Sequence, residues 1–267
     1  MNAVIGPFQP HPPQGRPPYV IAHRGISGKA PENTLASFAR ALDTPGIDMI
    51  ELDVRLSKEG EVIVLHDRSL QRTTTGNGLA RRYGLEELKR LDAGSWFDPR
   101  YRTERIPTLA EVFDLVQKRY WVNVELKYDA GTRHPEGMLE RKVLDVINTC
   151  GYRDHVLCSS FSGSVRSRLR QLDGAIKIGV IYNIYRDFGR LPSALAAPSG
   201  AVVFVCAKYE LSKRVVRDAR AHGIAVYVYT LNSIHDARRM MDLGIAGLMT
   251  DNADDLVPDL AGRPLPA

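Results

Sequence analysis

The sequence predicts an α/β fold, and within that class a closed (β/α)8 TIM barrel with a small insertion after the second strand. Apolar runs of strand length alternate with amphipathic runs of helix length along most of the 267 residues, a pattern typical of parallel strands covered by helices. About eight strand positions can be placed, which favours a closed barrel over an open doubly wound sheet. No Gly-x-Gly-x-x-Gly fingerprint follows the first strand, so a dinucleotide site is not expected.

The alternation places each element in turn. We expect strands at 19–23, 49–54, 121–127, 156–161, 177–182, 201–206, 225–230 and 247–250, and helices at 34–42, 109–118, 137–149, 164–172, 212–222 and 234–243. Asn33 or Thr34 can cap the first helix, and Thr108 with Glu111 three residues later forms a capping box.

One stretch interrupts this order. The segment between His66 and Pro107 is too long for a simple connection, and we expect an insertion at about 68–106 that covers part of the barrel mouth. Glu59-Gly60 predicts the turn of a hairpin whose second arm delivers His66. The predicted barrel domain is 19–257, between a disordered proline-rich tail at 1–18 and a C-terminal tail at 258–267.

Composition excludes several classes of protein. A hydrophobic content of 44% and a charged content of 25% fit a soluble globular protein. The net charge of +5 comes without a long basic run, and we expect the short clusters to be solvated helix faces rather than a nucleic-acid groove. These clusters are Arg166, Arg168 and Arg170, and Lys213, Arg214 and Arg217.

Cysteine usage and hydropathy bear on the compartment. The three cysteines have no Cys-x-x-Cys spacing, which indicates neither a zinc site nor a disulfide framework. Positions 1–18 contain no apolar run of signal-peptide length, and no stretch reaches the roughly 20 apolar residues that span a bilayer. We therefore expect a cytoplasmic protein with no stable membrane insertion.

Polar residues stand at the ends of three predicted strands. The first strand ends in His23-Arg24. Glu51 and Asp53 share one face of the second strand because side chains alternate with period two. The same alternation puts Glu125 and Lys127 on one face of the next strand, and the hairpin brings His66.

This set of residue types fits phosphodiester cleavage with a metal ion. Crowded carboxylates repel one another unless a hard divalent cation accepts their oxygens, which makes Glu51, Asp53 and Glu125 candidate metal ligands. Each could instead be an ordinary solvated strand residue, but three such strands in one chain weaken that interpretation. His23 and His66 titrate near neutrality and can act as base and acid respectively.

The order of the motifs resembles the glycerophosphodiester phosphodiesterase family over residues 19–257. The motifs are His23-Arg24-Gly25, Pro31-Glu32-Asn33-Thr34, Glu51-Leu52-Asp53-Val54, His66-Asp67, Arg72-Thr73-Thr74 with Gly76 and Gly78, Glu125-Leu126-Lys127, Ile106-Pro107-Thr108-Leu109 and Thr250-Asp251. Each motif alone is weak, whereas the ordered set is specific. One departure is Tyr229 before Thr-x-Asn, where many members have tryptophan.

The resemblance implies a TIM-barrel hydrolase that uses a divalent cation, usually Mg²⁺ or Ca²⁺, to split small-molecule glycerophosphodiesters into glycerol 3-phosphate and an alcohol. It implies acid/base roles for His23 and His66 and phosphate contacts for Arg24 and Lys127. It also implies the metal ligands Glu51, Asp53 and Glu125. Phe161 and Tyr229 end predicted strands and are candidate substrate contacts at the mouth.

Two alternatives stay open at this point. A lysophospholipase D-like enzyme on the same scaffold would act on lipid-bearing substrates, and an apolar rim would favour it. A non-catalytic barrel would bind a phosphorylated ligand without turnover, although binding an anion requires no histidine pair. The nucleophile could be water or the glycerol hydroxyl of the substrate, which would give a cyclic phosphate.

Overall fold

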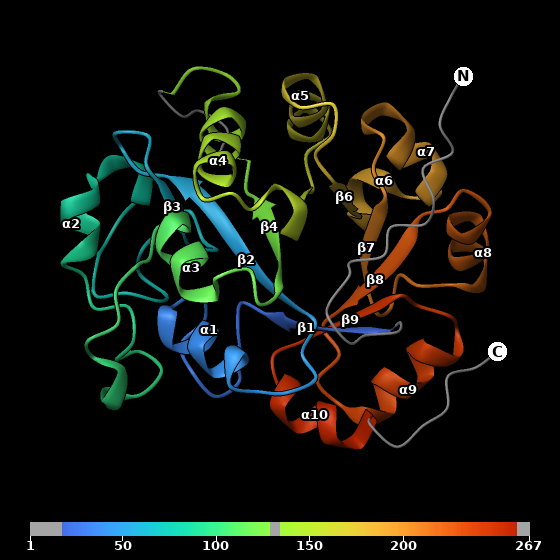
Figure 1. Cartoon of the computed structure of the whole chain (residues 1–267), viewed down its shortest axis with the longest axis horizontal. Coiled ribbons are helices and arrows are strands. Elements are labelled where there is room, and N and C mark those ends of the chain that lie inside the picture. The colour runs from blue at the N-terminus through green and yellow to red at the C-terminus, as the bar shows by residue number, and fades with distance from the viewer. Residues whose placement is uncertain (1–17, 129–133, 261–267) are drawn as a thin grey trace.

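Within residues 18–128 and 134–260, which the computed structural model describes, eight parallel strands close into the predicted barrel (Figure 1). β1 (Tyr19–His23) closes the ring by pairing with both β2 (Met49–Leu56) and β9 (Gly247–Thr250). From β2 onward the ring continues through β4 (Trp121–Leu126), β5 (Val156–Ser160), β6 (Ile178–Ile181), β7 (Val203–Ala207) and β8 (Ala225–Tyr229). Because all eight run parallel, their carboxyl ends meet at one rim.

The predicted helices cover the outside of this ring (Figure 1). They are α1 (Leu35–Leu42), α3 (Leu109–Val116), α4 (Met138–Thr149), α5 (Gly163–Leu172), α8 (Lys213–Ala221) and α9 (Ile234–Asp242). Each buries an apolar stripe against the strands in one continuous core. Thr34 Oγ1 accepts the N–H of Ser37, and Thr108 and Glu111 form the predicted capping box.

A second apolar cluster fills the interior of the barrel. Its buried members are Tyr19, Ile21, Met49, Trp121, Leu157, Ile181, Val203, Val205, Tyr227 and Met249. These side chains fill the barrel below the rim, so a ligand-binding site is expected at the carboxyl ends of the strands.

The predicted insertion is present between β2 and α3. β3 (Val62–Val64) pairs antiparallel with the end of β2 outside the ring, and Gly60 supplies the hairpin turn with a φ of +88°. The chain then passes through η1 (Ala80–Arg82), α2 (Leu85–Lys89) and η2 (Pro99–Tyr101). The insertion packs on its own buried cluster of Ile63, Leu65, Leu70, Ala80, Leu88, Ala93 and Ile106.

The structure adds elements that the sequence pattern did not predict. Between β6 and β7 lie two short helices, α6 (Ile184–Asp187) and α7 (Pro192–Ala196), which are too brief to show helical periodicity. α10 (Ala253–Leu260) runs past the expected domain boundary at 257 and contains Pro258. Of the predicted tails 1–18 and 258–267, residues 1–17 and 261–267 lie outside the described residues, whereas 258–260 belong to α10. Across the described ranges, no helix combines the length and apolarity needed to cross a membrane.

Asp48 is a half-buried carboxyl group directly before β2, at the end of the barrel opposite the rim. Its Oδ2 accepts the backbone N–H of Val20 at 2.8 Å. Burial raises the pKa of Asp48 from 3.8 to about 6. Burial also raises the pKa of Tyr19, Tyr120 and Tyr227, and the negative charge of Asp48 adds to each rise. Ionisation of Asp48 therefore opposes folding.

This shift predicts a pH-dependent gain in stability from Asp48→Asn. Because the folded pKa lies above the unfolded value, the contribution of Asp48 to stability is complete below about pH 4 and is lost as pH rises through about 6. The variant should exceed the wild type by roughly 1–2 kcal/mol at pH 8 and match it near pH 4. Urea unfolding at both pH values measures this, with the exposed Asp43→Asn as control; a difference that is constant with pH would contradict the account.

Candidate active site

The carboxyl ends of β1, β2 and β4 bring the predicted site residues to one cavity of about 170 Å³. The faces of β1 and β2 that bury Ile21 and Met49 inside the barrel carry His23 and Glu51 two residues further along. The predicted residues that line the cavity are His23, Arg24, Glu51, His66, Glu125, Lys127, Phe161 and Tyr229. Asp53 pairs in the sheet with Glu125 and lies directly beside them.

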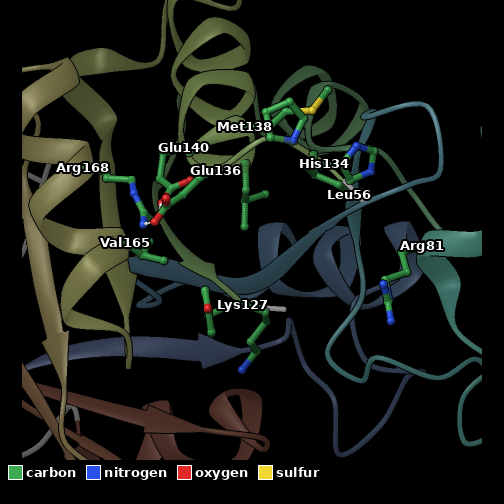
Figure 2. A pocket seen from close by; sticks show the side chains of 13 residues that line it. Leu56, Arg81, Lys127, His134, Glu136, Met138, Glu140, Val165 and Arg168 are labelled. Atoms are coloured by element: carbon green, nitrogen blue, oxygen red, sulfur yellow. Dashed lines mark hydrogen bonds and ion pairs between the residues drawn. The ribbon is translucent and has the colours of Figure 1, made fainter. Parts of the chain in front are cut away.

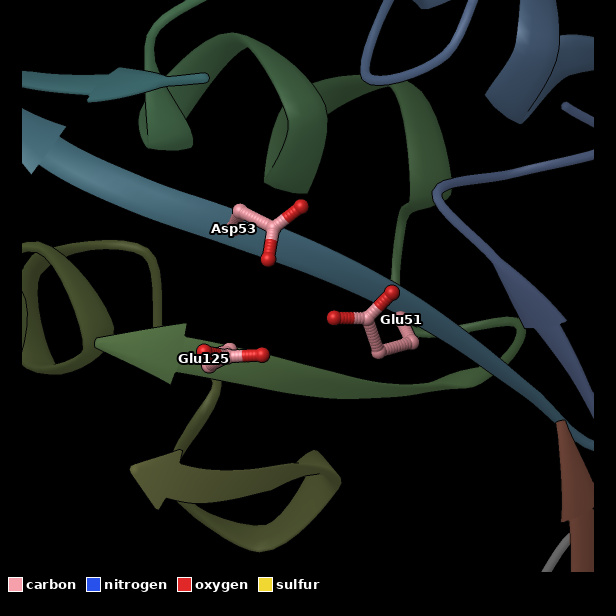
Figure 3. A group of neighbouring side chains, drawn as sticks. All are labelled: Glu51, Asp53 and Glu125. Atoms are coloured by element: carbon pink, nitrogen blue, oxygen red, sulfur yellow. The ribbon is translucent and has the colours of Figure 1, made fainter. Parts of the chain in front are cut away.

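Glu51, Asp53 and Glu125 form a cluster of buried carboxylates, named here the acidic triad (Figure 3). Glu51 and Asp53 project from β2, and Glu125 projects from the neighbouring strand β4. One oxygen from each residue lies within 4.8 Å of the chosen oxygens of the other two. The fold therefore brings together the three carboxylates that the sequence singled out.

Two cations offset part of this negative charge. Lys127 Nζ lies 2.8 Å from Asp53 Oδ1 and 2.5 Å from Glu125 Oε1. Arg24 Nε lies 3.3 Å from Asp53 Oδ2, which also accepts a hydrogen bond from Asn33 Nδ2 at 2.8 Å. Burial alone would raise the pKa of Asp53, but Lys127 and Arg24 hold it far below its usual value. Asp53 is therefore firmly ionised.

The other two carboxylates are less stable as anions. Burial and the charge of Asp53 raise the pKa of Glu51 to about 8. Burial also raises the pKa of Glu125, against the opposing charge of Lys127. Asp53 Oδ1 and Glu125 Oε1 are buried and accept no hydrogen bond of good geometry. Mutually repelling carboxylates with such oxygens fit a hard divalent cation, which takes several oxygen ligands.

His23 is oriented by a carboxylate outside the triad. Its Nδ1 lies 2.7 Å from Asp251 Oδ1, and Asp251 also accepts hydrogen bonds from Ser27 and Asn232. Burial would lower the pKa of His23, but the hydrogen bond to Asp251 and the charge of Glu51 raise it overall. Because Asp251 is ionised, with a pKa of about 2, Nδ1 donates to it. Nε2 of His23 is left 3.9 Å from Glu51 Oε2.

His66 is oriented by the next residue in the chain. Its Nδ1 lies 2.6 Å from Asp67 Oδ1. Burial lowers the pKa of His66, and the charges of Lys127 and Arg24 act in the same direction against that of Asp53. The two histidines of the cavity thus have pKa values shifted in opposite directions.

Arg72, from the insertion, connects the two sides of the site. Its Nε lies 2.6 Å from Asp67 Oδ2, and its two terminal nitrogens lie 2.7 and 2.8 Å from the two oxygens of Glu32. Glu32 also accepts a hydrogen bond from Arg24 at 2.9 Å. One arginine therefore ties the carboxylate that orients His66 to the carboxylate that holds Arg24.

Sequence reasoning assigned no role in the site to four of these supporting residues: Glu32, Asn33, Arg72 and Asp251. Arg24 and Asn33 have positive φ angles of 58° and 57°, a conformation that is uncommon outside glycine and leaves no periodic signal. Asp251 directly follows β9. The rule that polar residues at strand ends mark the site would have found it there.

The two aromatic candidates line the cavity from the ends of two other strands, Phe161 just after β5 and Tyr229 at the end of β8. The ring of Phe161 lies 5.9 Å from Lys127 Nζ, within reach of a cation–π contact. Tyr229, at the end of β8, is partly buried, and burial raises the pKa of its phenol well above the usual value. Tyr229 therefore stays neutral and can donate its O–H to a ligand.

A larger cavity of about 220 Å³ lies beside α4 and α5, and Figure 2 shows the side chains that line it. Glu140 is buried there and accepts a hydrogen bond from Arg168, while His134 interacts with the carbonyl of Ser57. Lys127 borders both cavities, but its Nζ contacts the acidic triad. The described lining of this second cavity brings no second carboxylate cluster together with a histidine pair, so we place the chemistry in the first.

Comparison with known proteins identifies relatives of this chain. The sequence profile of the "Glycerophosphoryl diester phosphodiesterase family" matches residues 23–255. The chain belongs to this family. It is 35% identical over 240 residues to a glycerophosphodiester phosphodiesterase of Caldanaerobacter subterraneus, covering 89% of this chain and 96% of that protein. A glycerophosphodiester phosphodiesterase of Bacillus subtilis is 32% identical, with coverage of 88% and 83%.

Solved structures of family members share the fold. An Oleispira antarctica phosphodiesterase, determined with its product sn-glycerol-3-phosphate, has a TM-score of 0.80 and 32% identity, covering 91% of this chain and 97% of that one. A glycerophosphodiester phosphodiesterase from Agrobacterium tumefaciens has a TM-score of 0.77 and 28% identity, with coverage of 90% and 99%. The TIM-barrel assignment made from the sequence is confirmed.

The Arg72 bridge predicts that Arg72→Lys destabilises this phosphodiesterase-family barrel although charge is conserved. A lysine cannot reproduce three contacts from one planar group, so the free energy of unfolding should fall by roughly 1 kcal/mol in urea titrations. Arg100→Lys is the control, because Arg100 is exposed in the same insertion and lies 3.8 Å from its partner Asp98. Equal losses for the two variants would refute the bridging role.

Proposed function

We propose that the chain hydrolyses glycerophosphodiesters to sn-glycerol 3-phosphate and an alcohol, using a divalent cation and the two cavity histidines. The observation that carries this proposal is the meeting, in one cavity, of the acidic triad, two cations and two histidines that each bond to a carboxylate. Family membership and the product bound to the Oleispira antarctica relative support the substrate class.

A phosphodiester is hard to attack because its negative charge repels nucleophiles and its alkoxide is a poor leaving group. Arg24 and Lys127 would contact the phosphoryl oxygens, with arginine as a planar donor and lysine as a point charge. Both are fixed by carboxylates, Arg24 through Glu32 and Lys127 through Asp53. They would bind the phosphate without moving far from these positions.

Glu51, Asp53 and Glu125 would hold the cation, Mg²⁺ or Ca²⁺, through oxygen ligands. When bound, the ion would supply Lewis-acid polarisation of a phosphoryl oxygen. The triad residues are buried, so their charge would act with little screening from solvent.

His23 and His66 would move the protons. Since Nδ1 of each ring is held by a carboxylate, Nε2 is the atom available to the substrate. His23 would accept the proton of the nucleophile, either water or the glycerol hydroxyl, as the new P–O bond forms. His66 would donate a proton to the alcohol oxygen as the old P–O bond breaks.

The pKa shifts in the described structure favour the reverse assignment of the two histidines, because the hydrogen bond to Asp251 and the charge of Glu51 raise the pKa of His23 against the effect of burial, whereas burial lowers that of His66. A cation on the triad would offset the charge of Glu51 at His23 and that of Asp53 at His66, and so would lower both pKa values. We retain His23 as base and His66 as acid, and a change of leaving group tests this assignment.

Purified protein should release glycerol 3-phosphate from glycerophosphocholine with Mg²⁺ or Ca²⁺ and stop in EDTA. His23→Ala and His66→Ala should each lower kcat by roughly 10²–10⁴-fold, the usual contribution of a general acid or base. His235→Ala, an exposed change on α9, should leave kcat within about twofold of the wild type. Undiminished turnover in EDTA would remove the metal from the proposal.

A substrate with a better leaving group distinguishes the histidine that acts as general acid from the one that acts as general base. Glycerophospho-p-nitrophenol releases an anion that needs little protonation, so it should restore most of the rate lost in His66→Ala but not in His23→Ala. Rescue of His23→Ala instead would reverse the two roles.

Lipid-bearing diesters are a second candidate substrate class. The favouring observation is that Tyr185 and Phe188, at α6, are strongly exposed, and that Arg186 between them donates to the carbonyl of the cavity residue Phe161. Release of choline from lysophosphatidylcholine at a rate comparable to glycerophosphocholine would place this class first. Tight ligand binding without product from either substrate would favour a non-catalytic barrel.

A further inference from the structure

Three large aromatic side chains stand exposed where α6 and α8 adjoin the barrel mouth. Tyr185 in α6 is 97% exposed, Phe188 just after α6 is 81% exposed, and Tyr209 between β7 and α8 is 79% exposed. Scattered exposed apolar residues are ordinary on a protein surface, but a group on one face marks a contact surface. α6 and α8 lie on the same side of the molecule (Figure 1).

Hydrogen bonds hold these rings at the rim of the active-site cavity. Glu210, next to Tyr209, accepts the backbone N–H of Ala207 at 2.7 Å and also bonds to the backbone of Ile184. Arg186 donates to the carbonyl of Phe161, whose side chain lines the cavity. The segments that carry the exposed rings are thus fastened both to each other and to the cavity wall.

The same face is basic. Between residues 182 and 217 no carboxylate is fully exposed. Asp187 is buried and pairs with Arg186 and Arg190, whereas Glu210 is only partly exposed. The exposed cations of this stretch are Arg186, Arg190, Lys208, Lys213, Arg214 and Arg217. Those in the first turns of α8, Lys213, Arg214 and Arg217, form no ion pair with any described residue.

This combination selects one kind of partner. Aromatic rings beside free lysines and arginines suit the interface of a bilayer, where rings enter the headgroup layer and cations meet anionic lipids. A second copy of the chain fits poorly, because an isologous contact would press like charges together. The rings line neither of the two cavities described above, whereas a nucleic-acid strand is typically bound in a basic groove lined by stacked aromatic rings.

We propose that the aromatic–basic rim, defined as Tyr185, Phe188 and Tyr209 with Lys213, Arg214 and Arg217, docks onto the surface of an anionic phospholipid bilayer. Docking requires no helix to enter the membrane, only the tips of these side chains. Because Phe161 joins the rim to the cavity, a docked molecule would present the cavity toward the headgroups. That consequence rests on the proposed function, whereas docking itself does not.

Vesicle sedimentation of the full chain tests docking without any turnover. The wild type should sediment with vesicles of phosphatidylcholine and phosphatidylglycerol in equal parts, bind weakly to phosphatidylcholine alone, and be released by high salt. K213Q/R214Q/R217Q should lower the partition coefficient by roughly a hundredfold, from a several-fold contribution per basic side chain near an anionic surface. Y185S/F188S/Y209S should lower it by at least about tenfold, since burial of ring area is lost.

Matched controls come from surfaces away from the rim. R238Q/R239Q removes two exposed arginines from α9, and L172S removes an exposed apolar side chain from the far end of α5; both should bind vesicles as the wild type does. If the triple aromatic variant has a lowered Tm, the single change F188S, at an exposed position, replaces it.

Four results would overturn the proposal. The wild type could remain in the supernatant with mixed vesicles, or the rim variants could bind as well as the wild type. The α9 variant could lose as much binding as the α8 variant, which would reduce the effect to overall charge. Sedimentation velocity without vesicles completes the test, because a dimer dissolved by Y185S/F188S/Y209S would reassign the surface to a second copy. None of these readouts depends on whether glycerophosphodiesters are cleaved.

Discussion

Mutual repulsion among three buried carboxylates at the carboxyl ends of β2 and β4 is the constraint around which the site is built. Asp53 is kept ionised by Lys127 and Arg24, whereas Glu51 and Glu125 have raised pKa values because burial opposes their charge. Such a cluster costs folding free energy unless cations neutralise it. The barrel supplies two of its own, Lys127 and Arg24, and still brings one oxygen of each of the three carboxylates close enough together to fit one divalent ion. The charge that would hold a cation and the stability of the fold therefore compete at the same residues.

The rest of the site holds this charged centre in register. Asp251 directly follows β9, and its contact with Nδ1 fixes the ring of His23 at the end of β1. Because β1 and β9 pair where the barrel closes, closure of the barrel brings Asp251 beside this histidine. On the other side, Arg72 reaches from the insertion to both Asp67 and Glu32. The insertion, which packs on its own apolar cluster, thereby becomes part of the active-site support. A structural change in either segment would therefore alter the orientation of His23 or His66.

Much of this arrangement was predictable because period-two alternation determines which strand residues share a face. That rule places Glu51 with Asp53, and Glu125 with Lys127, from the sequence alone, and the ring of strands brings the two pairs together. The rule fails where the backbone leaves regular structure. Asn33 reaches Asp53 from a residue with positive φ, and Arg72 acts from an irregular insertion, so neither has a periodic signature. The aromatic–basic rim could not be predicted from the sequence either, because α6 is too short to show a helical pattern.

The most direct test of the central claim is calorimetric titration of the metal-free protein with Mg²⁺ and with Ca²⁺. The account predicts one site per chain in the wild type, and its loss in Glu125→Gln, which keeps the size of the side chain and removes one buried charge. Glu136→Gln is the matched control because Glu136 is exposed and lies in the other cavity. Unchanged binding by Glu125→Gln would show that the ion does not bind at the acidic triad, and no binding by the wild type would show that Lys127 and Arg24 alone balance the triad.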